Sequence, residues 1–259
     1  MTIKPEKIVW NKSWGKQSEI VKISAADRKF FKHLINEINP KDKEVLELGC
    51  GRAALSYLLS EYEPESITLV DFSKEALLRA KNIFNNSKNI EFIEDDLLKF
   101  ETKKKYDIVF SSGVVEHFSN ELRELAIDKH FYASKDKVIF LVPAKPHYNS
   151  LRHRKRRTIE SFGWQKAFSR NEMNNYCRKH TNFNIIVSKR FYSMYGITLF
   201  ELLSLDSNNR IIDIYNTIVK YIDKVFIKLK LYLFLNFLLT PFENMIGGVL
   251  IIIAQKNKN

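Results

Sequence analysis

Five short apolar runs alternate with helix-like segments in the first part of the chain, and this alternation restricts its fold more than any other feature. The runs cover residues 44–48, 66–70, 90–93, 106–110 and 137–142. Apolar strands joined by helical crossovers predict a mostly parallel, doubly wound α/β sheet with both faces covered. Such folds bind their ligand outside the carboxyl ends of the strands. We therefore expect the functional site in the loops that follow these runs.

Helix signals between the runs support this reading. Leu55, Leu58 and Leu59 recur at helical spacing after the first run. Ser73 is a predicted N-cap after the second run, and a further helix fits 120–132. Ser169 and Glu172 have the spacing of a capping box, which predicts another helix start.

A glycine turn, Gly49-Cys50-Gly51, joins the first predicted strand to its helix. Glycines allow a sharp turn and a close approach of the backbone to a ligand. The same spacing also fits the G-x-G-x-x-G/A turn of dinucleotide-binding proteins, so the turn alone does not select a cofactor. Asp71, at the end of the second strand, suits a ribose diol in either case.

Three further features favour a cationic nucleoside over a dinucleotide. Glu47 precedes the turn, where a carboxylate attracts an ammonium or sulfonium group and repels a pyrophosphate. Asp95 and Asp96 end the third strand, where an acceptor can take the amine of adenine. The fourth strand opens into Ser111-Ser112-Gly113 at the same edge.

With these motifs, residues 40–190 resemble the class I S-adenosylmethionine-dependent methyltransferases. The resemblance implies S-adenosylmethionine as cofactor and a Rossmann-like sheet of seven strands with an antiparallel last strand, for which GGVLIIIAQK (247–256) is the candidate. Ala53 stands where many members carry a third glycine, and we expect slightly tighter packing there. The predicted cofactor-binding residues are Glu47, Gly49, Cys50, Gly51, Asp71, Phe72, Asp95, Asp96, Leu97 and Ser112.

The predicted organisation has four parts. Residues 1–40 form an N-terminal cap segment, 41–197 the methyltransferase core, 198–245 a helical lid insertion and 246–259 the final core strand. No paired Cys or His spacing indicates a metal site, and with only Cys50 and Cys177 no disulfide is expected.

On the acceptor side, His117 follows the fourth strand and is the candidate general base, because imidazole accepts a proton near neutral pH. The alternative is that Glu116-His117-Phe118 caps a helix and forms a wall of the pocket. The fourth strand lacks the Asn/Asp-Pro-Pro-aromatic signature of enzymes that methylate exocyclic base amines, so nucleic acid is not favoured as acceptor.

A long loop after the fifth strand carries the one dense charge run, residues 152–157. Such a run suits a phosphate or anionic lipid, although like-charge blocks are often only solvated. Gly163-Trp164 resembles the Gly-Trp of the acceptor loop in several small-molecule methyltransferases. The predicted substrate-binding residues are Arg154, Arg157 and Trp164.

Residues 211–239 combine an apolar helical stripe with lysines. This composition suits a lid over the acceptor pocket, which we prefer, or a basic amphipathic helix on a membrane surface. The chain has a net charge of +12. Most of its other lysines and arginines are scattered along the sequence, which indicates a solvated surface. No signal-peptide run is evident, which predicts a cytoplasmic protein with an optional peripheral membrane contact.

The resulting hypothesis is methyl transfer from S-adenosylmethionine to a small or lipid-linked, anionic acceptor, with oxygen preferred as the acceptor atom. A nicotinamide-dependent (NAD) oxidoreductase is the second hypothesis, and a non-catalytic methyltransferase fold for binding or membrane docking is the third. The sequence does not define an oligomeric state.

Overall fold

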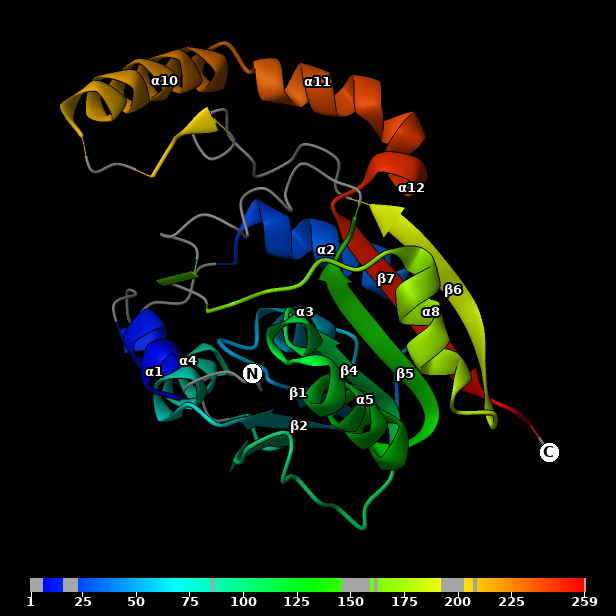
Figure 1. The fold of residues 1–259 in the computed structure, drawn as a ribbon. Coiled ribbons are helices and arrows are strands. Elements are labelled where there is room, and N and C mark those ends of the chain that lie inside the picture. Colours follow the sequence, from blue (N-terminus) through cyan, green and yellow to red (C-terminus); the bar gives the residue numbers. More distant parts are fainter. Residues whose placement is uncertain are drawn as a thin grey trace.

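The computed structural model describes residues 7–15, 23–84, 87–145, 159–160, 163–191, 203–206 and 209–258. Seven strands form one sheet in the order β3-β2-β1-β4-β5-β7-β6 (Figure 1). They are β1 (Glu44–Leu48), β2 (Ser66–Asp71), β3 (Ile90–Glu94), β4 (Tyr106–Ser112), β5 (Ser134–Pro143), β6 (Phe183–Phe191) and β7 (Val249–Lys256).

The sheet confirms the predicted class. The pairs among β1 to β5 are all parallel, whereas β7 lies between β5 and β6 and is antiparallel to both. The strand order reverses between β1 and β4, which is the switch point where doubly wound sheets bind ligands. The predicted sheet with an antiparallel last strand is therefore correct, and 249–256 is that strand.

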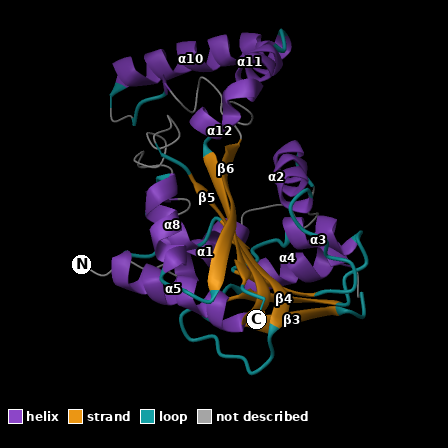
Figure 2. Cartoon of the chain, turned by 90° about the vertical axis from the view of Figure 1, so that its right-hand side faces the viewer, coloured by secondary structure: helices purple, strands orange, loops and turns teal. Residues whose placement is uncertain are grey.

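Helices cover both faces of the sheet (Figure 2). On one face α2 (Ala25–Ile35), α3 (Ala54–Ser60) and α4 (Lys74–Phe84) pack over a core that contains Leu34, Leu59 and Leu77. On the other, α5 (Asn120–Ala133) and α8 (Arg170–Arg178) enclose a second core with Phe131 and Met173. Successive strand residues alternate between these two cores, because side chains on a strand point to opposite faces.

The helix starts follow the predicted caps with one difference. The Ser73 hydroxyl accepts the N–H of Ala76 at 3.3 Å, so α4 begins at Lys74 as its cap predicts. The Ser169 hydroxyl likewise accepts the N–H of Glu172 at 3.2 Å. The Glu172 side chain instead forms ion pairs with Lys145 and Lys166, and these contacts take the place of the reciprocal half of the capping box.

Further helices lie outside the two layers. α1 (Lys7–Gly15) precedes α2, and the short helix η1 (Val115–His117) follows β4. α10 (Arg210–Lys228) and α11 (Leu231–Leu239) stand apart from the sheet, beyond the end to which β5 points (Figure 1). The chain returns through η2 (Thr240–Phe242) and α12 (Glu243–Ile246), which packs on β6. Among the described helices, none has both the length and the apolar character needed to span a bilayer.

Candidate cofactor and acceptor site

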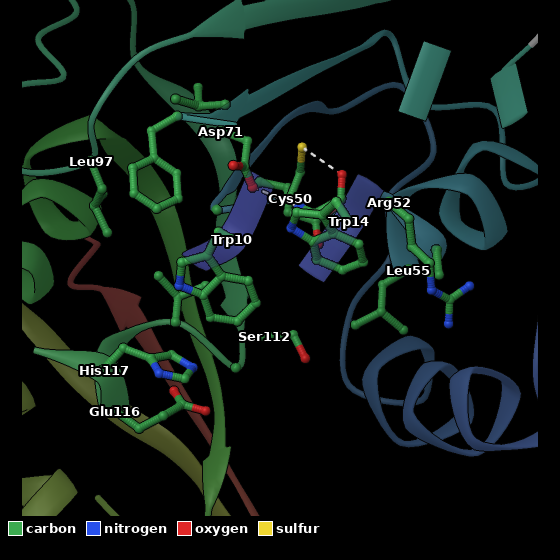
Figure 3. Close-up of a pocket in the computed structure, with 18 of the residues that line it drawn as sticks. Trp10, Trp14, Cys50, Arg52, Leu55, Asp71, Leu97, Ser112, Glu116 and His117 are labelled. Carbon is green, nitrogen blue, oxygen red and sulfur yellow. Dashed lines mark hydrogen bonds between the residues drawn. The ribbon is translucent and has the colours of Figure 1, made fainter. Parts of the chain in front are cut away.

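A cavity of about 430 Å³ lies at the carboxyl ends of β1, β2 and β4 (Figure 3). Ligand pockets in proteins fall in this range of volume. All ten residues predicted to bind the cofactor line this cavity, and so does His117. The structure therefore brings together side chains that are separated by up to 70 positions in the sequence.

The glycine turn has little room for side chains. Gly49 and Gly51 both have positive φ, at 71° and 53°. A Cβ atom on Gly49 would lie 2.6 Å from Val114, and one on Gly51 would lie 2.8 Å from the Trp14 ring. Glycine is therefore required at both positions by backbone conformation and by close neighbours.

Ala53 also has a left-handed backbone, with φ 53° and ψ 36°, immediately before α3. Only glycine adopts this conformation without a steric cost at Cβ. The expectation that Ala53 adds only slight bulk therefore misses the main effect, because the cost of alanine lies in the backbone angle.

Asp71 is buried at the end of β2, and its two carboxyl oxygens accept backbone N–H groups. Oδ2 accepts from Gly51 at 2.8 Å and Oδ1 from Ser73 at 2.9 Å. Burial raises the pKa of this carboxyl above its ordinary value, against the lowering effect of these N–H groups. Each oxygen keeps a second lone pair, so the group can also accept ligand hydroxyls.

Glu47 lies on the face of β1 that is covered by α3, and it is 3% exposed. Its Oε2 accepts the Ser56 hydroxyl at 2.5 Å. Burial raises the pKa of Glu47 to about 8, and nearby Asp71 adds to the effect. The carboxyl is thus mostly protonated at neutral pH, and a cation in the cavity would favour its ionised form.

Asp95 and Asp96 follow β3 at the same edge of the sheet. The Asp95 carboxylate accepts the N–H of Asp96 at 2.7 Å, and the Asp96 carboxylate accepts that of Leu98 at 3.0 Å. These bonds fix a tight turn, and Phe72 and Leu97 add apolar surface to the same part of the cavity.

Glu116 is a cavity residue that the sequence reasoning treated only as part of a motif. It is 3% exposed, and its Oε2 has no hydrogen-bond partner among the described residues. Burial raises the pKa of Glu116 to about 8. Figure 3 shows this carboxyl beside the His117 ring.

His117 is held by the segment that returns from the long loop. Its Nδ1 lies 3.0 Å from the carbonyl oxygen of Trp164, and the N–H of Lys166 donates to the Glu116 carbonyl at 3.0 Å. A carbonyl only accepts, so Nδ1 carries the proton and the lone pair of the neutral ring is on Nε2. Arg123, fully buried, fixes the same turn by donating to the carbonyls of Val115 and Phe118.

Two tryptophans of α1 cover the cavity. Trp14 lies against Gly51, and the Trp10 ring meets the His117 ring edge to face with centroids 5.1 Å apart. Trp10 and Trp14 are also stacked on each other at 6.1 Å. A lone tryptophan in a sequence does not define such a placement, which follows from the position of α1 over the glycine turn.

The residues predicted to bind the acceptor are placed less favourably. Trp164 does not line the cavity; its ring is half-exposed, with the Arg123 guanidinium 6.0 Å from its centroid. The backbone of Trp164 contacts His117, and the next residue, Gln165, lines the cavity. Arg154 and Arg157 lie outside the described residues.

An ion pair at the rim was not predicted. Arg52 and Asp27 are 2.6 Å apart, and both line the cavity. Arg52 directly follows the glycine turn, which was the available signal, whereas nothing near Asp27 links α2 to this loop. Within the described part of the chain no cluster of three or more potential metal ligands exists, and Cys50 and Cys177 are free and buried.

Comparison with known proteins agrees with this geometry. Residues 45–136 match the family model described as methyltransferase domain. The chain carries a class I S-adenosylmethionine-dependent methyltransferase domain. The matched part of this methyltransferase domain runs from β1 to the start of β5 and includes the glycine turn, Asp71, Asp96 and His117.

Curated relatives of the methyltransferase domain act on different acceptors. Malonyl-[acyl-carrier protein] O-methyltransferase 1 of Ilyobacter polytropus is 29% identical over 116 residues, which are 43% of this chain and 42% of that protein. The Bacillus anthracis malonyl-[acyl-carrier protein] O-methyltransferase is 25% identical over 158 residues, 57% of each chain. Ribosomal RNA small subunit methyltransferase A of Mesomycoplasma hyopneumoniae is 33% identical over 85 residues, 32% of each chain. The chain spans about half or less of the length of these relatives.

Solved methyltransferases share the fold over nearly the whole chain. The N-methyltransferase NodS of Bradyrhizobium japonicum with S-adenosylhomocysteine gives a TM-score of 0.58 at 12% identity, covering 96% of this chain and 99% of NodS. Magnesium protoporphyrin IX methyltransferase of Synechocystis with S-adenosylmethionine gives 0.55 at 12% identity, covering 96% and 90%. At these identities the likeness is one of fold.

Proposed function

We propose that the protein transfers the methyl group of S-adenosylmethionine to a small or lipid-linked, anionic acceptor, with oxygen as the favoured acceptor atom. The observation that carries the proposal is the acid-lined cavity at the switch point of the sheet, within the segment that matches the methyltransferase domain. S-adenosylmethionine supplies an electrophilic methyl group on a positively charged sulfur.

The residues in the cavity fit this cofactor. The second lone pairs on the Asp71 oxygens suit the ribose hydroxyls, and Asp96 with Phe72 and Leu97 suits the adenine. Glu47 would ionise beside the ammonium group of the methionine part, which compensates the cost of its burial. Gly49 and Gly51 let the backbone approach the ligand.

His117 would accept the proton of the acceptor through Nε2. The bond from Nδ1 to the Trp164 carbonyl supports this role, because it leaves the lone pair on the other nitrogen. Methyl transfer itself needs mainly alignment and exclusion of water, which the Trp10 and Trp14 rings would provide by covering the cavity. His117→Ala would then lower kcat with little change in cofactor affinity, and an unchanged kcat would refute a role as base.

The choice of an oxygen acceptor is supported by relatives named as malonyl-[acyl-carrier protein] O-methyltransferases. Other relatives are named ribosomal RNA small subunit methyltransferase A and pavine N-methyltransferase, so the acceptor has to be identified by experiment. The charge run 152–157 motivates an anionic acceptor.

A thermal-shift comparison tests the cofactor first. S-adenosylhomocysteine should raise the melting temperature, because a ligand that binds only the native state stabilises it, whereas NAD should not. A shift with NAD alone would favour the oxidoreductase hypothesis, which the family match does not support.

Incubation with radiolabelled S-adenosylmethionine and fractionated extract then tests the acceptor. Label in a lipid or small-molecule fraction is the expected result, and label only in RNA would overturn it. Binding of S-adenosylhomocysteine without transfer to any fraction would favour a non-catalytic module.

A further inference from the structure

The helix α10 has two faces that differ in their contacts. One face is attached to the segment around Leu203 to Leu205. The Asn216 side chain donates to the Leu205 carbonyl and accepts from the Leu205 N–H, both at 2.9 Å. Val219 and Asp223, on adjacent turns of this face, are buried. These contacts define the side of α10 that packs against the rest of the chain.

The opposite side of α10, which we call the outer face, is apolar and exposed. Its residues recur at intervals of three and four, which places them on one stripe of the helix. Their exposed fractions reach 74% at Ile211 and 54% at Ile218. The outer face consists of Ile211, Ile214, Ile218, Ile222, Val225 and Leu229.

Lysines form a row on a polar side of α10 that is distinct from the outer face. Lys220, Lys224 and Lys228 follow one another at intervals of four on α10, and all three side chains are exposed. At 100° per residue the row lies about 120° round the helix from the centre of the apolar stripe, with Lys228 nearest to the stripe and Lys220 nearly opposite it. An amphipathic helix with an apolar face and a lysine-rich polar face has the pattern that complements an anionic lipid surface.

The next helix extends the same character. α11 has the sequence LYLFLNFLL, and it carries Phe234 and Phe237 at 60% and 74% exposure. Phe242 and Met245 beyond it are also more than half exposed. Contiguous exposed apolar surface of this extent is characteristic of interaction sites. Figures 1 and 2 show α10 and α11 end to end along one side of the molecule, apart from the sheet.

We propose that the outer face of α10, together with α11, binds the surface of an anionic phospholipid bilayer. The helices would lie in the plane of the interface, with the apolar side chains among the acyl chains and the lysines at the phosphate groups. This surface is separate from the cofactor cavity, since no described residue of 203–246 lines that cavity. The inference therefore stands even if the proposed acceptor is wrong. A membrane contact also accounts for exposed side chains that a lid would bury.

Co-sedimentation of the full chain with vesicles tests the proposal. Vesicles of phosphatidylcholine with 30–40% phosphatidylglycerol, roughly the anionic content that generates a surface potential, should sediment the protein. Phosphatidylcholine alone should bind it at least about tenfold more weakly, because several lysines each contribute to attraction by anionic lipid. Retention in the supernatant with both vesicle types would overturn the proposal.

Paired variants distinguish vesicle binding through the outer face from non-specific hydrophobic adsorption. Ile218→Ser with Ile222→Ser should weaken vesicle binding by more than about tenfold, because two apolar side chains no longer enter the acyl region. The matched control is Leu78→Ser with Leu125→Ser, which removes two exposed leucines from α4 and α5 and should leave binding unchanged. Equal loss in both pairs would refute a specific face.

A charge series tests the lysine row. Replacement of Lys220, Lys224 and Lys228 by alanine should remove most of the preference for anionic vesicles, whereas alanine at the exposed Lys88, Lys99 and Lys103 should not. All variants should keep the thermal shift with S-adenosylhomocysteine, which shows that they fold and separates this test from the proposed activity. A concentration-dependent dimer that is lost in Ile218→Ser with Ile222→Ser, without vesicle binding, would assign the face to a second copy of the chain and overturn the proposal.

Discussion

The cofactor cavity and the α10–α11 surface differ in where they place charge and apolar groups. Six carboxyl side chains line the cavity: Asp27, Glu47, Asp71, Asp95, Asp96 and Glu116. Within the described lining, Arg52 is the one lysine or arginine, and it is paired with Asp27. The outer face of α10, by contrast, is exposed and apolar, and the polar side of the same helix carries three exposed lysines. The chain has a net charge of +12, yet its cavity is lined by carboxyl groups and suits a cation. The basic and apolar side chains of α10 are instead exposed.

The comparison predicts that the cavity, and not the helical surface, makes stability depend on pH. Glu47 and Glu116 have pKa values of about 8 when folded, against an ordinary 4.5. A raised folded pKa gives stability that is complete below 4.5 and is lost as pH rises through 8. As pH rises from 5 to 8, ionisation of each group should lower the unfolding free energy of the ligand-free protein by on the order of 3 kcal/mol.

Urea unfolding at several pH values measures this loss. Glu47→Gln should flatten part of the decline, since glutamine can still accept the Ser56 hydroxyl and does not ionise. Ile218→Ser with Ile222→Ser should shift the whole curve without changing its slope. A slope that Glu47→Gln leaves untouched would show that this carboxyl is ionised in the folded protein at neutral pH.

A second prediction concerns the charge that the cavity selects. Glu47→Gln should weaken S-adenosylmethionine binding by about tenfold to a hundredfold, because a charge-assisted contact contributes about 1.5–3 kcal/mol. Binding of methylthioadenosine, which lacks the ammonium and the sulfonium, should change little. Calorimetry in buffers of different ionisation enthalpy should also detect proton release by the wild type at pH 6.

Glu116→Gln is the matched control for this measurement, since its carboxyl lies in the same cavity with a similarly raised pKa. If Glu116→Gln, and not Glu47→Gln, abolishes proton release, the cation binds on the opposite side of the cavity from the one we infer.

Tryptophan fluorescence can report ligand binding in the cavity separately from vesicle binding at the outer face. Trp10 and Trp14 line the cavity and Trp164 does not. The fluorescence change on adding S-adenosylhomocysteine should therefore be mostly lost in Trp10→Phe with Trp14→Phe and retained in Trp164→Phe. Vesicles should leave this signal unchanged, because α1 is remote from the outer face. A response carried by Trp164 would move the ligand out of the cavity.

The smallest expected effect is at Ala53. Ala53→Gly should raise the unfolding free energy by about 0.5–1 kcal/mol, because glycine relieves a left-handed backbone but loses more chain entropy on folding. Thermal unfolding measures the change, and Ala54→Gly, inside α3 at the next position, should instead destabilise. Destabilisation by both would show that the lost methyl contact outweighs the strain.

Local signals in the sequence predicted the parts of the molecule that depend on local chemistry. The apolar runs placed the strands, Ser73 fixed the start of α4, and the glycine turn located the cavity. The sequence did not predict β6, because its residues FNIIVSKRF mix apolar and polar side chains, and one of the three that are buried is Arg190. β6 is an edge strand that pairs with β7, about 60 residues further along the chain. Such a non-local pairing leaves no signal in the local sequence.

Non-local contacts account for what the sequence did not reveal at the site. From the sequence, Arg123 would be taken for an ordinary surface charge on a helix. In the structure it is buried and supports the turn that holds His117. The ion pair of Asp27 with Arg52 joins α2 to the glycine turn, and no spacing rule connects them. The division of the chain into cap, core, insertion and final strand stays a prediction.

If His117 is the base, as we propose, its bond to the Trp164 carbonyl makes proton acceptance depend on a residue 47 positions away. The carbonyl commits Nδ1 as the donor, and loss of this contact would let the proton exchange between the two ring nitrogens. Substitutions in the 163–166 segment that move the backbone would alter turnover while leaving every side chain in the cavity intact.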